Sequence, residues 1–317
     1  MRRGCAVLRP IVSFDALKVR FLHQFFHPDL SAVSGIISQV AFDLAKNGDI
    51  VSVICSRNRY DGRNGNPLSS RERVNGVEIL RCWGPNFGKR SLLGRILDMS
   101  SFCLFASGKL LFAPRVDTVL FLTNPPFFSF MGTLLQRIRK ERFVYVLMDI
   151  YPDIAIKGGV FREKGWVASA LRRMARFPLA KADAVVVLGE DMKEVVIREG
   201  APADKVVIIR NWADPGKIYP VPPDKNRFRA EWGLEGKFVV QYSGNFGISH
   251  DFEDLLSVAE ELAPEDNIRF LLIGEGIRRP EVEEFVAIRK LPNVILLPYQ
   301  EASSLAESLS AGDVHYI

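Results

Sequence analysis

The sequence has few cysteines and no strong bias in composition. Only four of its 317 residues are cysteine (Cys5, Cys55, Cys82 and Cys103), and no two of them form a Cys-x-x-Cys pair. This scarcity, with 48% hydrophobic and 25% charged residues, excludes a disulfide scaffold, a collagen and a disordered chain. Three of the four thiols lie in apolar stretches, which predicts buried free thiols in a reducing cytoplasm.

The net charge is small as well. The chain carries 42 Lys and Arg against 37 Asp and Glu, a formal charge of +5. That excess is too weak to predict a nucleic-acid partner, although it suits a surface that faces anionic lipid or phosphate. The length predicts two domains of roughly 150 residues each.

Three short motifs that mark common enzyme classes are missing. No Gly-x-Gly-x-x-Gly follows a predicted strand, which counts against a dinucleotide-binding epimerase or oxidoreductase. The absence of Gly-x-x-x-x-Gly-Lys-Ser/Thr argues against a P-loop, and the absence of Gly-x-Ser-x-Gly argues against that type of hydrolase. His23 and His27 are four residues apart but lie on a strand and a loop rather than on one helical face, so we expect no metal site.

Neither a transmembrane helix nor an export signal is expected. Residues 118–136 carry no charge and are long enough to cross a bilayer, but Asn124-Pro125-Pro126 interrupts them near the middle. A strand, a turn and a helix explain this run better. Arg9 and Pro10 break the apolar core that an export signal needs, so we expect a cytoplasmic protein.

The dominant pattern is a short apolar run followed by a helical stretch, repeated along the chain. Helical spacing at residues 34–47 ends at Gly48. The alternation predicts an α/β fold of doubly wound parallel sheets. The predicted strands are residues 19–23, 50–55, 77–82, 118–122, 143–148, 184–188, 206–209, 238–242, 268–273 and 294–297.

The sequence also predicts where the domains lie. Residues 210–224 hold four prolines and no periodicity, as linkers do. We therefore expect a first α/β domain at 18–210, a linker at 211–224 and a second domain at 225–317, with 1–17 as an extension. The second series stops in a half-made apolar strand, so we expect this domain to be incomplete. Ligands of such sheets bind beyond the carboxyl ends of the strands, which places the expected site in a cleft between the domains.

Two loops of the second domain are candidate anion sites. The strand at 238–242 leads into Ser243-Gly244-Asn245-Phe-Gly247 and then His250, and glycines at a helix start let a phosphate approach backbone N–H groups. The next strand leads into Gly274-Glu275-Gly276, where the carboxylate can accept hydrogen bonds from a sugar or a base. For each loop, a strand–helix turn without a ligand is an equally good interpretation.

The first domain offers matching candidates at its strand ends. Ser34 and Gly35 follow the first strand and are expected to place an uncapped helix N-terminus at the cleft. Asp149 follows the strand at 143–148, where a carboxylate can orient a hydroxyl or stabilise a positive charge. From position alone, a turn or helix-capping role for Asp149 is the simpler interpretation.

Two stretches combine apolar and basic residues. Residues 89–112 and 162–181 are long enough to form helices that dock on a membrane surface. The alternative is a pair of core-covering helices with solvated basic faces.

Four segments together resemble a known family. They are LGEDMKE at 188–194, GAPADKVVIIRNWAD at 200–214, SGNFG at 243–247 and LIGEG at 272–276. In order and spacing they are similar to those of retaining glycosyltransferases of the two-Rossmann-domain (GT-B) type, group 1, family 4. The nearest likeness is to the transferases of bacterial surface-polysaccharide assembly, of the colanic-acid or fucosamine-transferase type, and it covers residues 18–317.

The resemblance implies a function and roles for the candidate residues. A nucleotide-sugar, expected to be UDP-linked, is held by the second domain, and a polyprenyl-diphosphate-linked saccharide by the first, at the inner membrane face. The loop at 243–247 approaches the donor phosphates, the loop at 274–276 lies near the base, and the loop at Ser34–Gly35 closes over the diphosphate. Asp149 matches the place where many relatives carry a histidine that faces the sugar. Helix N-termini and cations stabilise the leaving diphosphate, so no metal or other cofactor is expected.

The sequence departs from the family pattern in ways that keep other interpretations open. Asn245 and His250 stand where many relatives have arginine and lysine. The family's carboxylate-bearing segment is expected beyond residue 317. A truncated, non-catalytic remnant or binding module is therefore the alternative, and a Rossmann-type epimerase or oxidoreductase the third interpretation.

Overall fold

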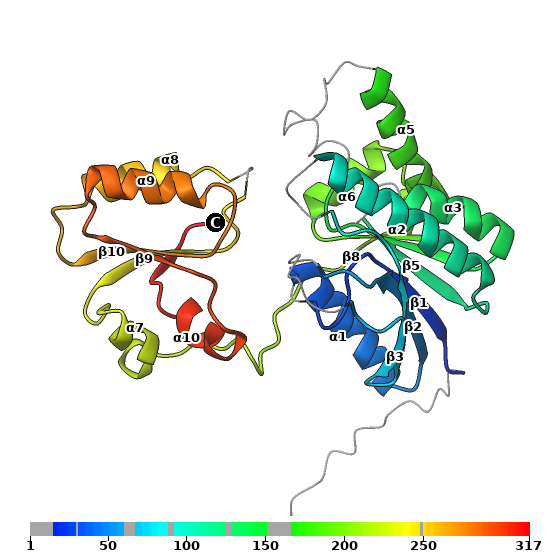
Figure 1. Cartoon of the computed structure of the whole chain (residues 1–317), viewed down its shortest axis with the longest axis horizontal. Helices are drawn as coiled ribbons and strands as arrows, with labels where there is room; N and C mark the ends of the chain where they lie inside the picture. The colour runs from blue at the N-terminus through cyan, green and yellow to red at the C-terminus, as the bar shows by residue number, and fades with distance from the viewer. Residues whose placement is uncertain are drawn as a thin grey trace, which may run out of the picture. The chain divides into compact units, whose positions relative to one another are not determined.

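The computed structural model describes residues 15–29, 31–59, 67–87, 92–123, 128–150, 166–247 and 250–317. Its contacts divide the chain into two compact units, Met1–Asn211 (unit 1) and Trp212–Ile317 (unit 2). Each unit has its own sheet of mainly parallel strands with helices on both faces, as Figure 1 shows for each in turn. The α/β class of the chain is therefore as the alternation of apolar runs and helices predicts.

Unit 1 is built on an eight-stranded sheet in the order β3-β4-β2-β1-β5-β6-β7-β8. All neighbouring strands are parallel except β3 and β4. The seven parallel strands coincide with predicted apolar runs, because strands covered on both faces must be apolar along their length. Their bounds are β1 (Lys18–Leu22), β2 (Ile50–Ser56), β3 (Arg71–Val74), β4 (Val77–Cys82), β5 (Thr118–Leu122), β6 (Arg142–Val146), β7 (Ala184–Val187) and β8 (Val206–Ile208).

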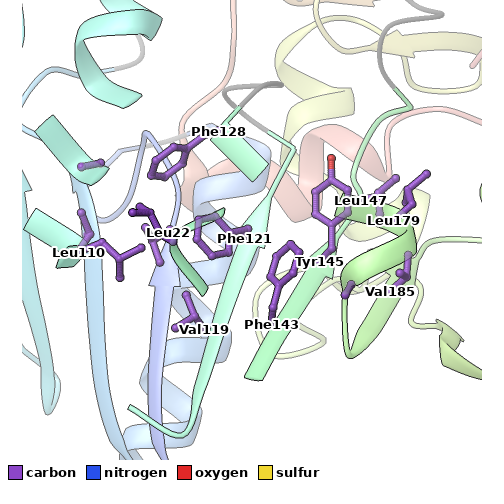
Figure 2. Packing of buried hydrophobic residues seen from close by; sticks show 14 of the residues in the cluster. Leu22, Leu110, Val119, Phe121, Phe128, Phe143, Tyr145, Leu147, Leu179 and Val185 are labelled. Carbon is purple, nitrogen blue, oxygen red and sulfur yellow. The ribbon is translucent and has the colours of Figure 1, made fainter. Parts of the chain in front are cut away.

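Helices cover both faces of this sheet with separate apolar clusters. On one face α1 buries Ile37 and Ala41 against β1, β2 and β4. On the other face lies the larger cluster, in which Phe121, Phe128 and Phe143 meet edge to face (Figure 2). The described helices of unit 1 are α1 (Ala32–Lys46), α2 (Leu92–Phe112), α3 (Phe128–Arg139), α5 (Trp166–Lys181) and α6 (Glu190–Arg198).

The long uncharged run at 118–136 folds as its prolines suggest. It supplies β5 and most of α3. Within the described residues, no helix has both the length and the apolar character needed to span a bilayer. The described cysteines are free thiols, and burial raises the pKa of Cys55 and Cys103 to about 12 and that of Cys82 to about 11. The prediction of buried free thiols is confirmed for Cys55 and Cys82, whereas Cys103 is half-buried.

One glycine sets the distance between α3 and the sheet. A Cβ atom added at Gly132 would lie 2.2 Å from the ring of Phe121. We expect Gly132→Ala to destabilise unit 1 by about 1–3 kcal/mol, because the ring has no room to move in the core. Gly108→Ala in α2 is the matched control: its Cβ meets open space, and alanine favours helix by up to about 1 kcal/mol. Urea unfolding of the two variants should shift in opposite directions, and equal shifts would contradict the packing argument.

Unit 2 has a four-stranded parallel sheet in the order β11-β10-β9-β12. Its strands are β9 (Phe238–Ser243), β10 (Ile268–Ile273), β11 (Val294–Leu297) and β12 (Val314–His315). The helices α8 (Glu253–Glu261) and α9 (Arg279–Arg289) cover one face, and α7 (Arg227–Glu231) and α10 (Leu305–Leu309) the other (Figure 1). The strand order places the carboxyl ends of β9 and β10 side by side, and the candidate loops follow these ends.

Candidate functional site

The two candidate loops of unit 2 are joined by backbone hydrogen bonds. The N–H of Gly244 donates to the carbonyl of Ile273 (2.9 Å), and the N–H of Phe246 donates to the carbonyl of Glu275 (2.9 Å). The N–H of Arg278 returns to the carbonyl of Phe246 at 3.0 Å. The structure therefore brings together the predicted residues 243–247 and 274–276 in one paired edge beyond the sheet.

The glycines of the second loop are required by this pairing. Gly274 has φ +147°, and a Cβ there would lie 1.8 Å from the carbonyl oxygen of Gly244. Gly276 has φ +156°, and a Cβ there would lie 2.3 Å from the carbonyl oxygen of Phe246. Both positions combine a left-handed backbone with close approach of another backbone, so only glycine fits. Loop-to-loop contact thus accounts for these two glycines.

The first loop lies over an aromatic cluster that the sequence reading missed. The Tyr242 ring is perpendicular to those of Phe246 and Phe252, at centroid distances of 5.2 and 5.0 Å. The Tyr242 hydroxyl donates to the carbonyl of Asn245 at 2.7 Å, and it lies 2.7 Å from Nδ1 of His250. The alternation of Val239-Val-Gln-Tyr242 along β9 is a signal that the tyrosine side chain faces the helix layer below the loop.

A cavity of about 400 Å³ opens beside this loop. It contains two of the predicted loop residues, Ser243 and Gly244, together with the predicted His250. Among the described residues, its lining is Tyr242, Ser243, Gly244, His250, Asp251, Phe252, Tyr316 and Ile317. An anion held here would meet a glycine backbone and an imidazole ring, which are both suited to phosphate.

An arginine that the sequence reading overlooked holds the second loop. Arg279, the first residue of α9, donates to the carbonyl of Gly274 and, at 2.9 Å, to that of Leu297. Its guanidinium also lies 3.1 Å from the Glu275 carboxylate and 2.7 Å from that of Glu283. The Glu275 side chain is half-exposed and is paired with Arg279. Its carboxylate is therefore only partly available to accept hydrogen bonds from a sugar or a base.

Asp149 lies in unit 1, three residues beyond the end of β6. The strand ends earlier than predicted, although the N–H of Leu147 still donates to Val186 in β7 and that of Met148 to the Thr123 hydroxyl. Asp149 is an exposed residue, yet partial desolvation raises the pKa of its carboxyl above the ordinary value. Among the described residues no hydrogen bond to this carboxylate is found, and residues 151–165 lie outside the description. A desolvated carboxylate in a loop after a strand is a candidate functional group.

The helix start in unit 1 differs from the expectation. Helix α1 begins at Ala32, and Ser31 caps it by accepting from the N–H of Ser34 at 3.3 Å. The Ser34 hydroxyl is buried and lies 2.9 Å from the carbonyls of both Asp29 and Ser31, either of which can accept its proton. The expectation of an uncapped N-terminus at Ser34 is therefore wrong.

Because α1 begins at Ala32, Gly35 lies inside the helix rather than at its start. Its N–H donates to the carbonyl of Ser31, inside the helix, and a Cβ there would meet nothing within 4 Å. No close approach to described atoms requires a glycine at this position. The N–H groups of the first turn nearest the helix end belong to Ala32 and Val33 rather than to the predicted pair.

No group of three or more His, Cys, Asp or Glu side chains within the described ranges is arranged to hold a metal ion. Metal-independent chemistry stays a prediction. The candidate residues divide between the units: Ser34, Gly35 and Asp149 lie in unit 1, and the two paired loops and His250 lie in unit 2.

Comparison with known proteins gives a consistent result. Residues 35–212 match the family described as "Glycosyl transferase 4-like domain". The chain is 32% identical over 195 residues to the "Probable glycosyltransferase WbjE" of Pseudomonas aeruginosa, over 61% of this chain and 48% of that protein. It is 25% identical over 304 residues to the "Putative colanic acid biosynthesis glycosyl transferase WcaI" of Escherichia coli (strain K12), over 92% and 74%. The matches thus span about half of WbjE and about three quarters of WcaI.

Solved structures share the fold. Anabaena Alr3699/HepE in complex with UDP and glucose superposes with a TM-score of 0.64 at 17% identity, over 94% of this chain and 73% of that one. Sucrose-phosphate synthase from Thermosynechococcus elongatus gives 0.70 at 15% identity, over 94% and 74%. WaaG, described as a glycosyltransferase involved in lipopolysaccharide biosynthesis, gives 0.62 at 16%, over 94% and 74%. The two α/β units of the chain therefore have the GT-B fold, as the sequence predicts.

Proposed function

The chain belongs to the glycosyl transferase 4-like domain family, and from that premise we propose a specific reaction for it. It transfers a sugar, with retention of configuration, from a UDP-linked donor to a polyprenyl-diphosphate-linked saccharide during bacterial surface-polysaccharide synthesis. The name of WbjE supports a glycosyltransferase. The name of WcaI, a putative colanic acid biosynthesis glycosyl transferase, supports the polysaccharide role. The complex of HepE with UDP-glucose supports the nucleotide donor.

The paired loops of unit 2 are the observation that carries the proposal. Backbone hydrogen bonds join these loops, and Gly274 and Gly276 pack closely against the backbone of the first loop. With the aromatic cluster below, these contacts fix the backbone beside the 400 Å³ cavity before any ligand binds. Transfer must stabilise a departing diphosphate, and preorganised dipoles do so without reorganisation in the reaction. In this proposal unit 2 holds the donor through residues 243–247, 274–276 and His250, while Asp149 of unit 1 stabilises the positive charge that develops on the sugar.

A donor-loop variant tests this assignment. A Cβ at Gly244 would lie 3.1 Å from the Tyr242 hydroxyl, so the larger side chain in Gly244→Val displaces the loop from its position beside the cavity. We expect UDP binding by the full chain, measured by calorimetry, to weaken at least about tenfold. Gly108→Ala, in α2, serves as the control. Unchanged affinity in Gly244→Val would show that this loop is not the donor site.

Activity is tested by release of UDP from a panel of UDP-sugars in the presence of bacterial membranes. Turnover that requires the membranes supports the lipid-linked acceptor. Donor binding with no turnover on any acceptor would favour the binding-module alternative.

The outer surface of unit 1 supports contact with a membrane. Helix α2 covers the core with Phe102, Ala106 and Leu110, but its opposite face is apolar too. We call this surface, with the neighbouring part of α3, the α2–α3 apolar face; its exposed residues are Leu97, Leu104, Phe105, Leu111, Phe112, Met131, Leu134 and Ile138. Exposed cations lie on α3 and just beyond the ends of both helices: Arg115, Arg137, Lys140 and Arg142. We propose that this face docks on an anionic bilayer, because apolar insertion and cation attraction act together there.

Vesicle sedimentation checks the membrane contact. We expect the full chain to bind vesicles of phosphatidylglycerol and phosphatidylethanolamine, and the double variant Leu104→Gln/Phe112→Gln to bind about tenfold or more weakly, since two large apolar side chains no longer insert. Ile288→Gln removes from unit 2 an apolar side chain as exposed as Leu104 and should have no effect. Equal binding by the double variant and the wild type would contradict the docking face.

A further inference from the structure

The Tyr242 hydroxyl has one proton and two partners. The carbonyl of Asn245 and the Nδ1 atom of His250 both lie 2.7 Å from it. A carbonyl can only accept, so the hydroxyl proton must point to Asn245. The tyrosine oxygen can then only accept from the imidazole, which requires the hydrogen of a neutral His250 ring to be on Nδ1. The remaining ring nitrogen, Nε2, carries a lone pair.

The surrounding contacts hold this arrangement. Burial, with Tyr299 nearby, raises the pKa of the Tyr242 hydroxyl, which therefore keeps its proton. The Tyr242 and His250 rings are nearly perpendicular, at 85° and 6.1 Å between centroids. On the other side, Nη1 of Arg278 donates to the His250 carbonyl at 2.7 Å. The imidazole is thus held at both its backbone and one ring nitrogen, at the edge of the cavity.

The charges around His250 come from several elements. Asp251 follows it, and that carboxylate accepts from the N–H of Glu253 at the start of α8. Arg278, before α9, is paired with Glu281 at 3.0 Å. Tyr316, after β12, donates its hydroxyl to the carbonyl of Asp251. The cation Arg278 and the anions Asp251 and Glu281 are therefore already engaged with each other or with backbone, and residues 248 and 249 lie outside the described residues.

We propose that His250 contacts the donor diphosphate and takes up a proton when the diphosphate binds. In the free protein Tyr242 holds the ring in the Nδ1–H tautomer. This inference rests on the proposed function, which places the donor diphosphate in this cavity. When the diphosphate binds, one proton from solvent adds to Nε2, the Nδ1–H bond to Tyr242 stays intact, and the ring becomes a cation that donates to a phosphate oxygen. Histidine suits this role because its charge changes between pH 5 and 8.

Two measurements on the full chain test the inference. The chain has four histidines, so the imidazole nitrogens can be followed by NMR after labelling with 15N-histidine. His23 serves as an internal reference, because burial lowers its pKa to about 4 and keeps it neutral. In the free protein we expect His250 to show the Nδ1–H tautomer, and Tyr242→Phe to lose that preference.

The second measurement is calorimetry with UDP-glucose, GDP-mannose and ADP-glucose, whose diphosphates are esterified at both ends and keep their charge over the pH range tested. In two buffers of different ionisation enthalpy, binding by the wild type should take up a proton and weaken as the pH rises from 6 to 8. We expect His250→Gln to bind about tenfold more weakly without proton uptake. His250→Lys should restore affinity and abolish the pH dependence, and His315→Gln should behave as the wild type.

The outcomes separate this inference from the proposed function. An Nε2–H tautomer in the free protein, or donor binding that is independent of pH and unchanged in His250→Gln, overturns the role of His250 and leaves the donor site in place. Failure of all three nucleotide-sugars to bind the wild type overturns both.

Discussion

Replacing Gly276 or Gly274 with alanine is expected to disrupt unit 2 and abolish donor binding. Each substitution places a Cβ within 2.3 Å of a backbone oxygen of the neighbouring loop, at a φ that L-residues rarely adopt. A flexible side chain could move away, but the obstructing atoms belong to residues that are themselves hydrogen-bonded across the loops. Left-handed strain and displaced backbone together should cost about 3 kcal/mol or more.

Hydrogen exchange resolves this effect by unit. Amides of β9 and β10 should exchange much faster in Gly276→Ala than in the wild type, while those of β1 and β5 should be unchanged. Gly247→Ala is the matched control in the first loop: its Cβ would meet mainly the mobile amide end of Asn245 at 2.9 Å, without a left-handed backbone. We expect its exchange to stay close to wild type. If Gly276→Ala kept the protection of β9 and β10, the paired edge would not be a rigid element.

The same comparison separates two reasons for a glycine. The sequence shows Gly244, Gly247, Gly274 and Gly276 as one class, suited to phosphate approach. The structure divides them: the last two are needed by the neighbouring loop, and the first two border side chains. A single sequence cannot distinguish these cases, because the partner that excludes a Cβ comes from a segment about 30 residues away.

Strands that are buried on both faces were predictable for a simple reason. β2 (Ile50–Ser56) and β9 (Phe238–Ser243) are mainly apolar, and that pattern can be recognised without knowing which distant segments pack against them. β3 was missed because Arg71-Glu-Arg-Val74 is polar, as an edge strand of a hairpin is expected to be. The signal was the Asn75-Gly76 pair, which has positive φ at both residues and forms the hairpin turn to β4.

The helix start in unit 1 was predicted too late, at Ser34 instead of Ala32. Ser31 and Ser34 are both acceptable caps by residue type. The structure selects Ser31, because the Ser34 hydroxyl already donates its proton to the carbonyl of Asp29 or Ser31. Tyr242 and Arg279 were missed for a different reason, since neither belongs to a recognised sequence motif. Both side chains hold the loops by donating hydrogen bonds to backbone carbonyls, and such contacts cannot be read from the sequence.

Asp149→Asn should nearly abolish sugar transfer and leave the fold intact. The pKa of the Asp149 carboxyl is raised by desolvation, so its ionised form is less favourable in the folded chain than in the unfolded one. Above the ordinary pKa the charge therefore costs stability, and removing it should leave thermal stability at neutral pH equal or slightly higher. That difference should vanish as the pH falls below about 4, where the carboxyl is protonated in both states. A carboxylate that costs stability and has no hydrogen-bond partner among the described residues is a candidate for a role in function.

Transfer by Asp149→Asn should fall about a hundredfold or more, because the amide cannot stabilise the positive charge on the sugar. Asp183→Asn provides the reverse case. The Asp183 carboxylate accepts from the N–H of Phe143 at 2.8 Å, so that variant should lose stability and keep its turnover per folded molecule. Initial rates with a saturating nucleotide-sugar, with melting curves at pH 7 and pH 4 for both variants, decide the matter. Full activity in Asp149→Asn would remove this carboxylate from the reaction and return it to the role of a turn residue.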